Sequence, residues 1–242
     1  MHESDWDSVI GRAREHGVQK FLFAAGSLPD AEESLALTLG KQDFYSTIGV
    51  HPCRATEPTK GLKVESATEK QIDEVIEKYF AKIRAILLDK EKRAKIVAIG
   101  ECGLDYDRFE YASKEAQMRV FPKHFALTEE FKLPMYLHSR ACEEDFLRIL
   151  KDNRHRFPSG VVHSFSGTES ELKELLEMGL FIGVNGCSLK TKENCEMVKK
   201  IPLDKIMLET DCPYCDIRNT HHSMQFVKSK FAKTKKENCN GQ

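Results

Sequence analysis

Residues 96–101 read Ile-Val-Ala-Ile-Gly-Glu, an apolar run of β-strand length that ends in a glycine and a carboxylate. Similar short runs of apolar or β-branched residues recur along the chain, each followed by Gly, Pro or a polar cluster. Together they predict seven strands, at residues 21–25, 45–50, 96–100, 135–138, 161–165, 181–184 and 206–209. Strands that are nearly all apolar are typical of a parallel sheet buried on both faces.

The segments between these strands have the period of amphipathic helices. The longest, residues 69–90, repeats apolar side chains at spacings of three and four. Comparable patterns predict further helices, at residues 5–15, 29–39, 114–131, 143–151, 169–178 and 194–200. This alternation favours an α/β fold, either a TIM-type (β/α) barrel or an open doubly wound sheet. No Gly-rich phosphate loop follows any predicted strand, which favours the barrel.

Seven strand–helix units are one short of a barrel, and the chain opens on a helical pattern, so the first strand is the one expected to be lacking. The length of 242 residues suits one large domain. We therefore expect an incomplete barrel over residues 1–227 and a basic tail over residues 228–242. The tail is predicted to be disordered, although its five lysines could also contact a DNA backbone.

The overall composition excludes some classes of protein. With 37 Lys and Arg against 38 Asp and Glu, the chain has no general basic field, so a polyanion would have to be bound locally. No apolar run approaches the roughly 18 residues of a membrane span, and no membrane partner is expected. Eight scattered cysteines without framework spacing predict reduced thiols, and hence an intracellular protein of the cytoplasm or nucleus.

Four polar residues stand at or near the carboxyl ends of predicted strands: Glu101, His138, His163 and Asp211. Ligands of parallel α/β folds bind at that edge of the sheet, and a buried charge without a partner costs several kcal/mol. The four residues therefore predict a metal site of mixed imidazole and carboxylate ligands, suited to Zn²⁺, Mn²⁺ or Mg²⁺. Carboxylates can bridge two ions, and such a pair suits the hydrolysis of phosphodiesters.

Five strings of the sequence resemble, in order, the motifs of the TatD family of metal-dependent deoxyribonucleases. They are Gly49-Val-His-Pro52, Gly100-Glu-Cys-Gly-Leu-Asp105, Pro134-Met-Tyr-Leu-His-Ser-Arg140, Val161-Val-His-Ser-Phe165 and Glu209-Thr-Asp-Cys-Pro213. A sixth string, Asn185-Gly-Cys-Ser-Leu-Lys190, is most similar to sequences of the eukaryotic branch of this family. The resemblance implies a barrel of the amidohydrolase kind and a Mg²⁺-dependent 3′ to 5′ exonuclease that acts on DNA, especially single-stranded 3′ ends.

The resemblance also implies the roles of individual residues around two divalent ions, Mg²⁺ before Mn²⁺ or Zn²⁺. Glu101 would bridge both ions, His138 and His163 would bind one, and Asp211 would bind the other. Glu101 and Asp211 would be the catalytic pair, with Asp211 orienting or deprotonating the attacking water. Asp105 and Glu209 are expected to orient the ligands rather than to bind metal.

Two further residues are predicted to contact the substrate. Arg140 would bind phosphate, because its guanidinium group matches phosphate oxygens in a bidentate fork; the alternative is a surface arginine. His51 would contact the phosphate or the scissile oxygen; the alternative is a turn residue before Pro52.

Departures from the family pattern leave two alternative functions open. Nothing before Asp5 supplies the opening-strand ligands of the family, so activity is expected to be impaired, and a non-catalytic interaction protein built on a truncated barrel is one alternative. Cys212-Pro-Tyr-Cys215 reproduces a glutaredoxin motif, and a thiol oxidoreductase using Cys212 and Cys215 is the other. The motif's position near the end of a long chain disfavours this second alternative.

Overall fold

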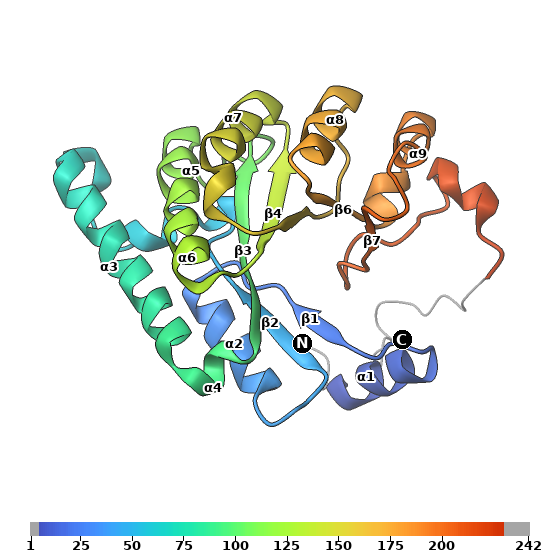
Figure 1. The fold of residues 1–242 in the computed structure, drawn as a ribbon, viewed down its shortest axis with the longest axis horizontal. Coiled ribbons are helices and arrows are strands. Elements are labelled where there is room, and N and C mark those ends of the chain that lie inside the picture. Colours follow the sequence, from blue (N-terminus) through green and yellow to red (C-terminus); the bar gives the residue numbers. More distant parts are fainter. Residues whose placement is uncertain (1–4, 230–242) are drawn as a thin grey trace.

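The computed structural model describes residues 5–229, which form a seven-stranded, entirely parallel sheet. Its strands are β1 Phe21–Phe23, β2 Phe44–Ile48, β3 Ile96–Asp105, β4 Met135–Arg140, β5 Gly160–Val162, β6 Phe181–Val184 and β7 Ile206–Leu208. They are hydrogen-bonded in chain order, with β1 and β7 at the two edges. A doubly wound sheet would reverse its strand order, so this topology confirms the barrel type. The sheet curls into a half-barrel with helices outside it (Figure 1).

Helices connect successive strands, as predicted. They are α1 Trp6–Glu15, α2 Leu28–Thr38, α3 Glu69–Leu88, α4 Lys90–Arg93, α5 Lys114–Val120, α6 His124–Phe131, α7 Glu143–Asn153, α8 Glu169–Glu177 and α9 Lys192–Val198. The prediction of one continuous helix over residues 114–131 is wrong, because a 3₁₀ turn, Phe121–Lys123, separates α5 from α6. Pro122 has no N–H with which to continue the helical hydrogen bonds.

Strand β3 is five residues longer than the apolar run that predicts it, since it ends at Asp105 instead of Gly100. Its pairing with β4 continues through Gly103 opposite His138 and Asp105 opposite Arg140. Gly103 has a φ of +149°, and a Cβ built on it would lie 1.9 Å from the His138 carbonyl oxygen. Only glycine permits this approach. Glu101 therefore lies inside the strand, at a shift in register, and not beyond its end.

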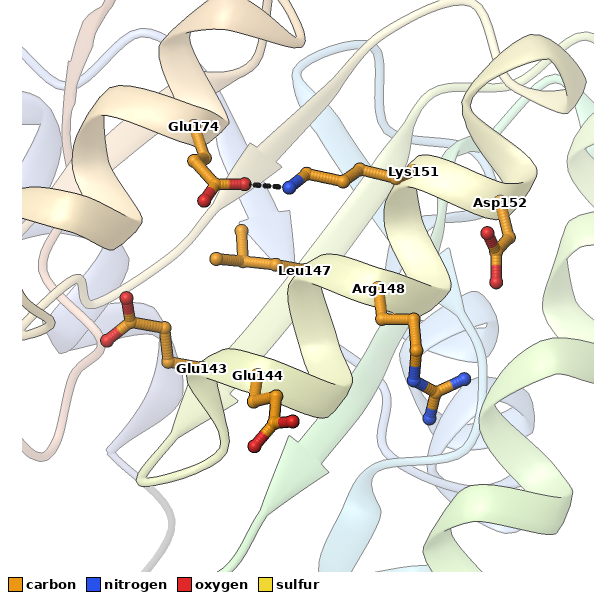
Figure 2. Close-up of a pocket in the computed structure, with 7 residues that line it drawn as sticks. All are labelled: Glu143, Glu144, Leu147, Arg148, Lys151, Asp152 and Glu174. Carbon is orange, nitrogen blue, oxygen red and sulfur yellow. Dashed lines mark ion pairs between the residues drawn. The ribbon is translucent and has the colours of Figure 1, made fainter.

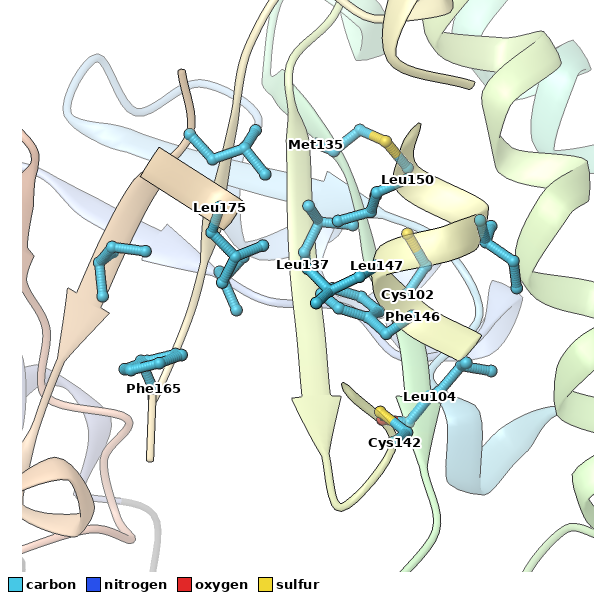
Figure 3. Packing of buried hydrophobic residues seen from close by; sticks show 14 of the residues in the cluster. Cys102, Leu104, Met135, Leu137, Cys142, Phe146, Leu147, Leu150, Phe165 and Leu175 are labelled. Atoms are coloured by element: carbon cyan, nitrogen blue, oxygen red, sulfur yellow. The ribbon is translucent and has the colours of Figure 1, made fainter. Parts of the chain in front are cut away.

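Two apolar clusters hold the helices on the sheet. One packs α7 and α8 against the central strands, and Figure 3 shows Met135 and Leu137 of β4 beside side chains of α7. The other packs α2, α3 and α6 against β2 and β3. Successive side chains of a strand point to opposite faces. Because Met135 and Leu137 face the helices, His138 and Arg140 lie on the inner face of the half-barrel.

The predicted basic tail falls mainly on residues 230–242, which lie outside the described residues. Among residues 5–229, no helix combines the length and the apolar character needed to cross a membrane.

Candidate metal centre

Glu101 is the hub of a cluster of imidazoles on the inner face. Its Oε1 atom lies 2.7 Å from His163 Nε2 and 2.9 Å from His138 Nδ1. His51 Nε2 is 3.3 Å from the same oxygen, and the rings of His51 and His138 meet edge to face. The side chains of all four residues are at most 17% exposed. Histidines from three separate chain segments thus direct ring nitrogens at one carboxylate.

Asp105 holds the far side of the His138 ring. The Asp105 side chain is fully buried, and its Oδ2 atom lies 3.1 Å from His138 Nε2. The backbone N–H of Asp107 donates to Oδ1, so the carboxylate is itself fixed. With Nε2 held in this way, Nδ1 of His138 faces Glu101. This contact supports the prediction that Asp105 orients a ligand.

Glu209 plays a similar part beside His163. Its Oε1 atom lies 3.7 Å from His163 Nδ1 and accepts hydrogen bonds from the Ser164 backbone N–H and the Asn185 side-chain amide. The Tyr136 hydroxyl donates to its other oxygen at 3.3 Å, and the Tyr136 ring stacks on His163. These contacts agree with the orienting role expected of Glu209.

Two predicted site residues lie apart from this cluster. Asp211 follows β7 and accepts a hydrogen bond from the Cys215 thiol at 3.1 Å. Within the described part of the chain it makes no hydrogen bond or ion pair with Glu101, His138 or His163. Arg140 ends β4, is 41% exposed, and pairs with Asp107 at 3.1 Å. The structure thus brings together Glu101, His138, His163 and His51, and leaves Asp211 and Arg140 on neighbouring loops and strand ends.

The charges of the cluster stabilise one another. Burial alone would raise the pKa of Glu101, but the charge of His163 and the imidazole hydrogen bonds hold that pKa well below its ordinary value. Burial alone would lower the pKa of His163, but the charge and hydrogen bond of Glu101, together with Glu209, raise it to about 10. An ionised carboxylate is therefore surrounded by imidazoles whose positive charge it favours.

The donor set fits a divalent ion. Ligand atoms of His51, Glu101 and His138 lie within 4.8 Å of one another, and His163 Nε2 contacts the same carboxylate oxygen. Imidazole and carboxylate together suit first-row divalent metals, and the oxygen of a carboxylate can be shared by two ions. In addition, the buried Nδ1 of His163 has no hydrogen-bond partner within the described residues.

A pocket on the outside of the molecule is separate from this centre. It lies between α7 and α8 and is lined by charged side chains, including the ion pair of Lys151 and Glu174 (Figure 2). Its residues belong to the helical layer, whereas the cluster lies on the inner face of the sheet. We refer to this feature as the outer pocket.

Sequence reasoning missed Tyr136 and Asn185 as parts of the site and assigned His51 to the substrate alone. Tyr136 could have been found, because it lies two residues before His138 and four before Arg140 along β4 and therefore shares their face. The contact of Asn185 with Glu209 joins two loops and has no local signal in the sequence.

Comparisons with known proteins agree with this geometry. The family described as TatD related DNase matches residues 1–239. Deoxyribonuclease Tat-D of Schizosaccharomyces pombe is 41% identical over 98% of this chain and 73% of its own length. The 3′-5′ ssDNA/RNA exonuclease TatD of Cronobacter sakazakii is 34% identical over 88% of this chain and 73% of its own. A crystal structure of a TatD family hydrolase from Entamoeba histolytica covers 95% of this chain and 72% of its own, with a TM-score of 0.79 and 32% identity. The chain therefore belongs to the TatD-related DNase family, whose named members are hydrolases of phosphodiester bonds.

Proposed function

We propose that this protein is a metal-dependent nuclease that removes nucleotides from the 3′ ends of single-stranded DNA. One observation carries the proposal: a largely buried carboxylate, Glu101, faces three imidazole nitrogens within 3.3 Å on the inner face of a half-barrel. The printed names of relatives as deoxyribonuclease and 3′-5′ ssDNA/RNA exonuclease support the choice of substrate.

Glu101, His138 and His163 hold one divalent ion in this proposal, and Glu101 and Asp211 hold a second. We propose Mg²⁺, with Mn²⁺ or Zn²⁺ as the alternatives. A bound divalent ion lowers the pKa of its water and neutralises charge on a phosphodiester. His138 and His163 contact the same oxygen of Glu101, which supports Glu101 as the bridging ligand.

The remaining steps belong to the side chains of the protein. Asp211 accepts the proton of the attacking water, and His51 donates a hydrogen bond to the scissile phosphate. Arg140 binds a phosphate oxygen pair in a bidentate fork. Its present partner, Asp107, is more than half exposed, and such surface ion pairs contribute at most about 1 kcal/mol. Arg140 can therefore exchange Asp107 for a phosphate at little cost.

We also place the protein inside the cell, in the cytoplasm or the nucleus. Within the described residues, Cys53, Cys102, Cys142, Cys187, Cys195, Cys212 and Cys215 are free thiols. Free thiols are typical of reducing compartments, which supports this location.

A nuclease assay tests the proposal. Release of nucleotides from a 3′-labelled and a 5′-labelled single strand is followed with Mg²⁺ or Mn²⁺, under reducing conditions, for the unaltered chain and two variants. Asp211→Asn should lower the rate at least about 100-fold, since removing a general base costs roughly 10²- to 10⁴-fold. Lys151→Ala, in the outer pocket, is the matched control and should keep the full rate.

Three outcomes would overturn the proposal. A rate that does not respond to chelation of divalent ions would exclude metal-dependent hydrolysis. Equal rates for the unaltered chain and Asp211→Asn would show that Asp211 has no catalytic role. If the protein bound metal yet released no nucleotide at any metal concentration, the non-catalytic interaction protein would be the better description.

A further inference from the structure

Two cysteines from different loops meet beside the candidate active site. Cys187 lies in η6, the 3₁₀ turn Gly186–Leu189 that follows β6, and Cys215 lies in the loop after β7. Their Sγ atoms are 3.1 Å apart, and both side chains are partly accessible. A disulfide bond measures about 2.0 Å, so the two sulfurs need to approach by only about 1 Å.

The backbones of the two loops are already in contact. A Cβ built on Gly186 would lie 2.1 Å from the Cys215 carbonyl oxygen, so the loop after β7 is seated directly on η6. The Asn185 side chain fixes η6 by accepting a hydrogen bond from the Cys187 N–H at 2.9 Å. Bridging the two cysteines therefore requires little movement of either loop.

The same pair is connected to Asp211. The Cys187 thiol donates to Cys215 Sγ, and the Cys215 thiol donates to Asp211 Oδ2 at 3.1 Å. This is the hydrogen bond that orients the Asp211 carboxylate within the described residues. A bond between the sulfurs removes both thiol hydrogens, so Cys215 can no longer donate a hydrogen bond to Asp211.

We propose that Cys187 and Cys215 form a reversible disulfide that lowers the activity of the enzyme by releasing Asp211. The oxidant is a low-molecular-weight disulfide such as oxidised glutathione. One cysteine thiolate attacks the disulfide and expels a thiol, and the second cysteine then attacks the mixed disulfide and expels another. Two electrons and two protons leave the protein and appear as two reduced thiols.

The pairing differs from the one that the Cys212-Pro-Tyr-Cys215 motif suggests. In a glutaredoxin, the first cysteine of the motif lies at the start of a helix, which stabilises its thiolate. Cys212 is exposed, and the next helical segment of the described chain begins only at His222. The sulfur beside Cys215 is that of Cys187, from a loop that the motif does not include.

Mass spectrometry and kinetics test this inference, whose kinetic part rests on the proposed nuclease function. The protein is incubated in glutathione buffers of increasing oxidised fraction, and the bridge is located by peptide mapping. The unaltered chain and the control Cys212→Ser should each lose two hydrogen atoms, with the link between Cys187 and Cys215. Their nuclease rates should fall about 10-fold or more, as expected when a ligand loses its orienting contact, and a dithiol reductant should restore them.

Cys187→Ser removes the bridge and leaves Cys215 and Asp211 in place. The reduced variant should have the same nuclease rate as the unaltered chain. In oxidant, the molecules that carry no glutathione adduct, as counted by mass spectrometry, should keep that rate. Absence of the bridge, or a link from Cys215 to Cys212 or Cys239, would overturn the pairing. A bridge that forms without slowing the enzyme would overturn the connection to Asp211. Mapping the bridge needs no activity, so an inactive reduced protein would refute only the proposed function.

Discussion

Asp105 acts on the candidate centre through His138. Its carboxylate is fully buried and bonds His138 Nε2, which leaves Nδ1 directed at Glu101. An amide at this position has nearly the same shape but carries no charge, and its N–H₂ group can face the ring nitrogen instead of an oxygen. The orientation and basicity of His138 therefore depend on the charge of Asp105.

We predict that Asp105→Asn weakens the binding of Mn²⁺ about 10- to 100-fold, the usual cost of losing the partner of a metal-binding histidine. Isothermal titration calorimetry measures the affinity, and circular dichroism checks that the fold is retained. Glu144→Gln in the outer pocket is the charge-matched control and should bind Mn²⁺ like the unaltered chain. An unchanged affinity in Asp105→Asn would show that His138 does not bind the ion.

His124 makes the stability of the fold depend on pH. It is fully buried on α6, where its Nε2 accepts the Val50 N–H at 2.9 Å and its Nδ1 lies 3.0 Å from the Phe121 carbonyl oxygen. Burial lowers its pKa to about 4. Below pH 6.5 the unfolded chain takes up a proton at this histidine that the folded chain refuses, so the free energy of unfolding falls as the pH falls from 6.5 to 4.

We expect this histidine to remove about 3 kcal/mol of stability across that interval, on the scale of about 1.4 kcal/mol per pKa unit. His124→Gln keeps an acceptor for the Val50 N–H but does not titrate. Urea unfolding at several pH values should therefore give a shallower loss of stability for this variant, whatever its stability at neutral pH. If the free energy of unfolding fell equally with pH in the two proteins, the lowered pKa of His124 in the folded chain would be contradicted.

Strand β3 depends on glycine where it approaches β4. Gly103 combines a positive φ with a Cβ position that the His138 carbonyl already fills. Gly61 has a positive φ of +89° but open space around its Cβ position. A side chain at Gly61 would thus meet only the cost of an unfavourable backbone angle, whereas one at Gly103 would also collide with the His138 carbonyl.

Gly103→Ala should destabilise the protein by at least about 2 kcal/mol more than Gly61→Ala, because only the first forces β3 and β4 apart. Urea unfolding of both variants gives the difference in the free energy of unfolding. Equal losses would mean that β3 and β4 can separate locally without cost, and the placement of Glu101 beside His138 would then lack its structural basis.

At the level of elements, the sequence predicted all seven strands because each is a run of apolar residues, including the partly exposed edge strands β1 and β7. The prediction of element boundaries failed where the local sequence pattern and the tertiary contacts disagree. The extension of β3 to Asp105 comes from pairing with β4, and no apolar run marks it. The helical period of residues 114–131 hid a break at Pro122, which the chain accommodates with a 3₁₀ turn that keeps both helices on the sheet.

Across the whole molecule, consecutive strand order brings residues far apart in the sequence to one face. Glu101 and His163 are 62 residues apart, yet their side chains meet at 2.7 Å. The motifs indicated both residues as candidates, and the parallel topology predicted that these two would converge. The closeness of His51 to Glu101, and the pairing of Asp211 with Cys215 instead of with the cluster, depend on loop conformations that no motif encodes.

The position of bound metal is the most direct test of the account. Crystals of the protein grown with Mn²⁺ would reveal the ion by its anomalous scattering. We predict one peak about 2.0–2.3 Å from ligand atoms of Glu101, His138 and His163, and a second shared by Glu101 and Asp211. Manganese bound only at surface carboxylates such as those of the outer pocket, with Glu101 still hydrogen-bonded to its three imidazoles, would contradict the proposed metal centre.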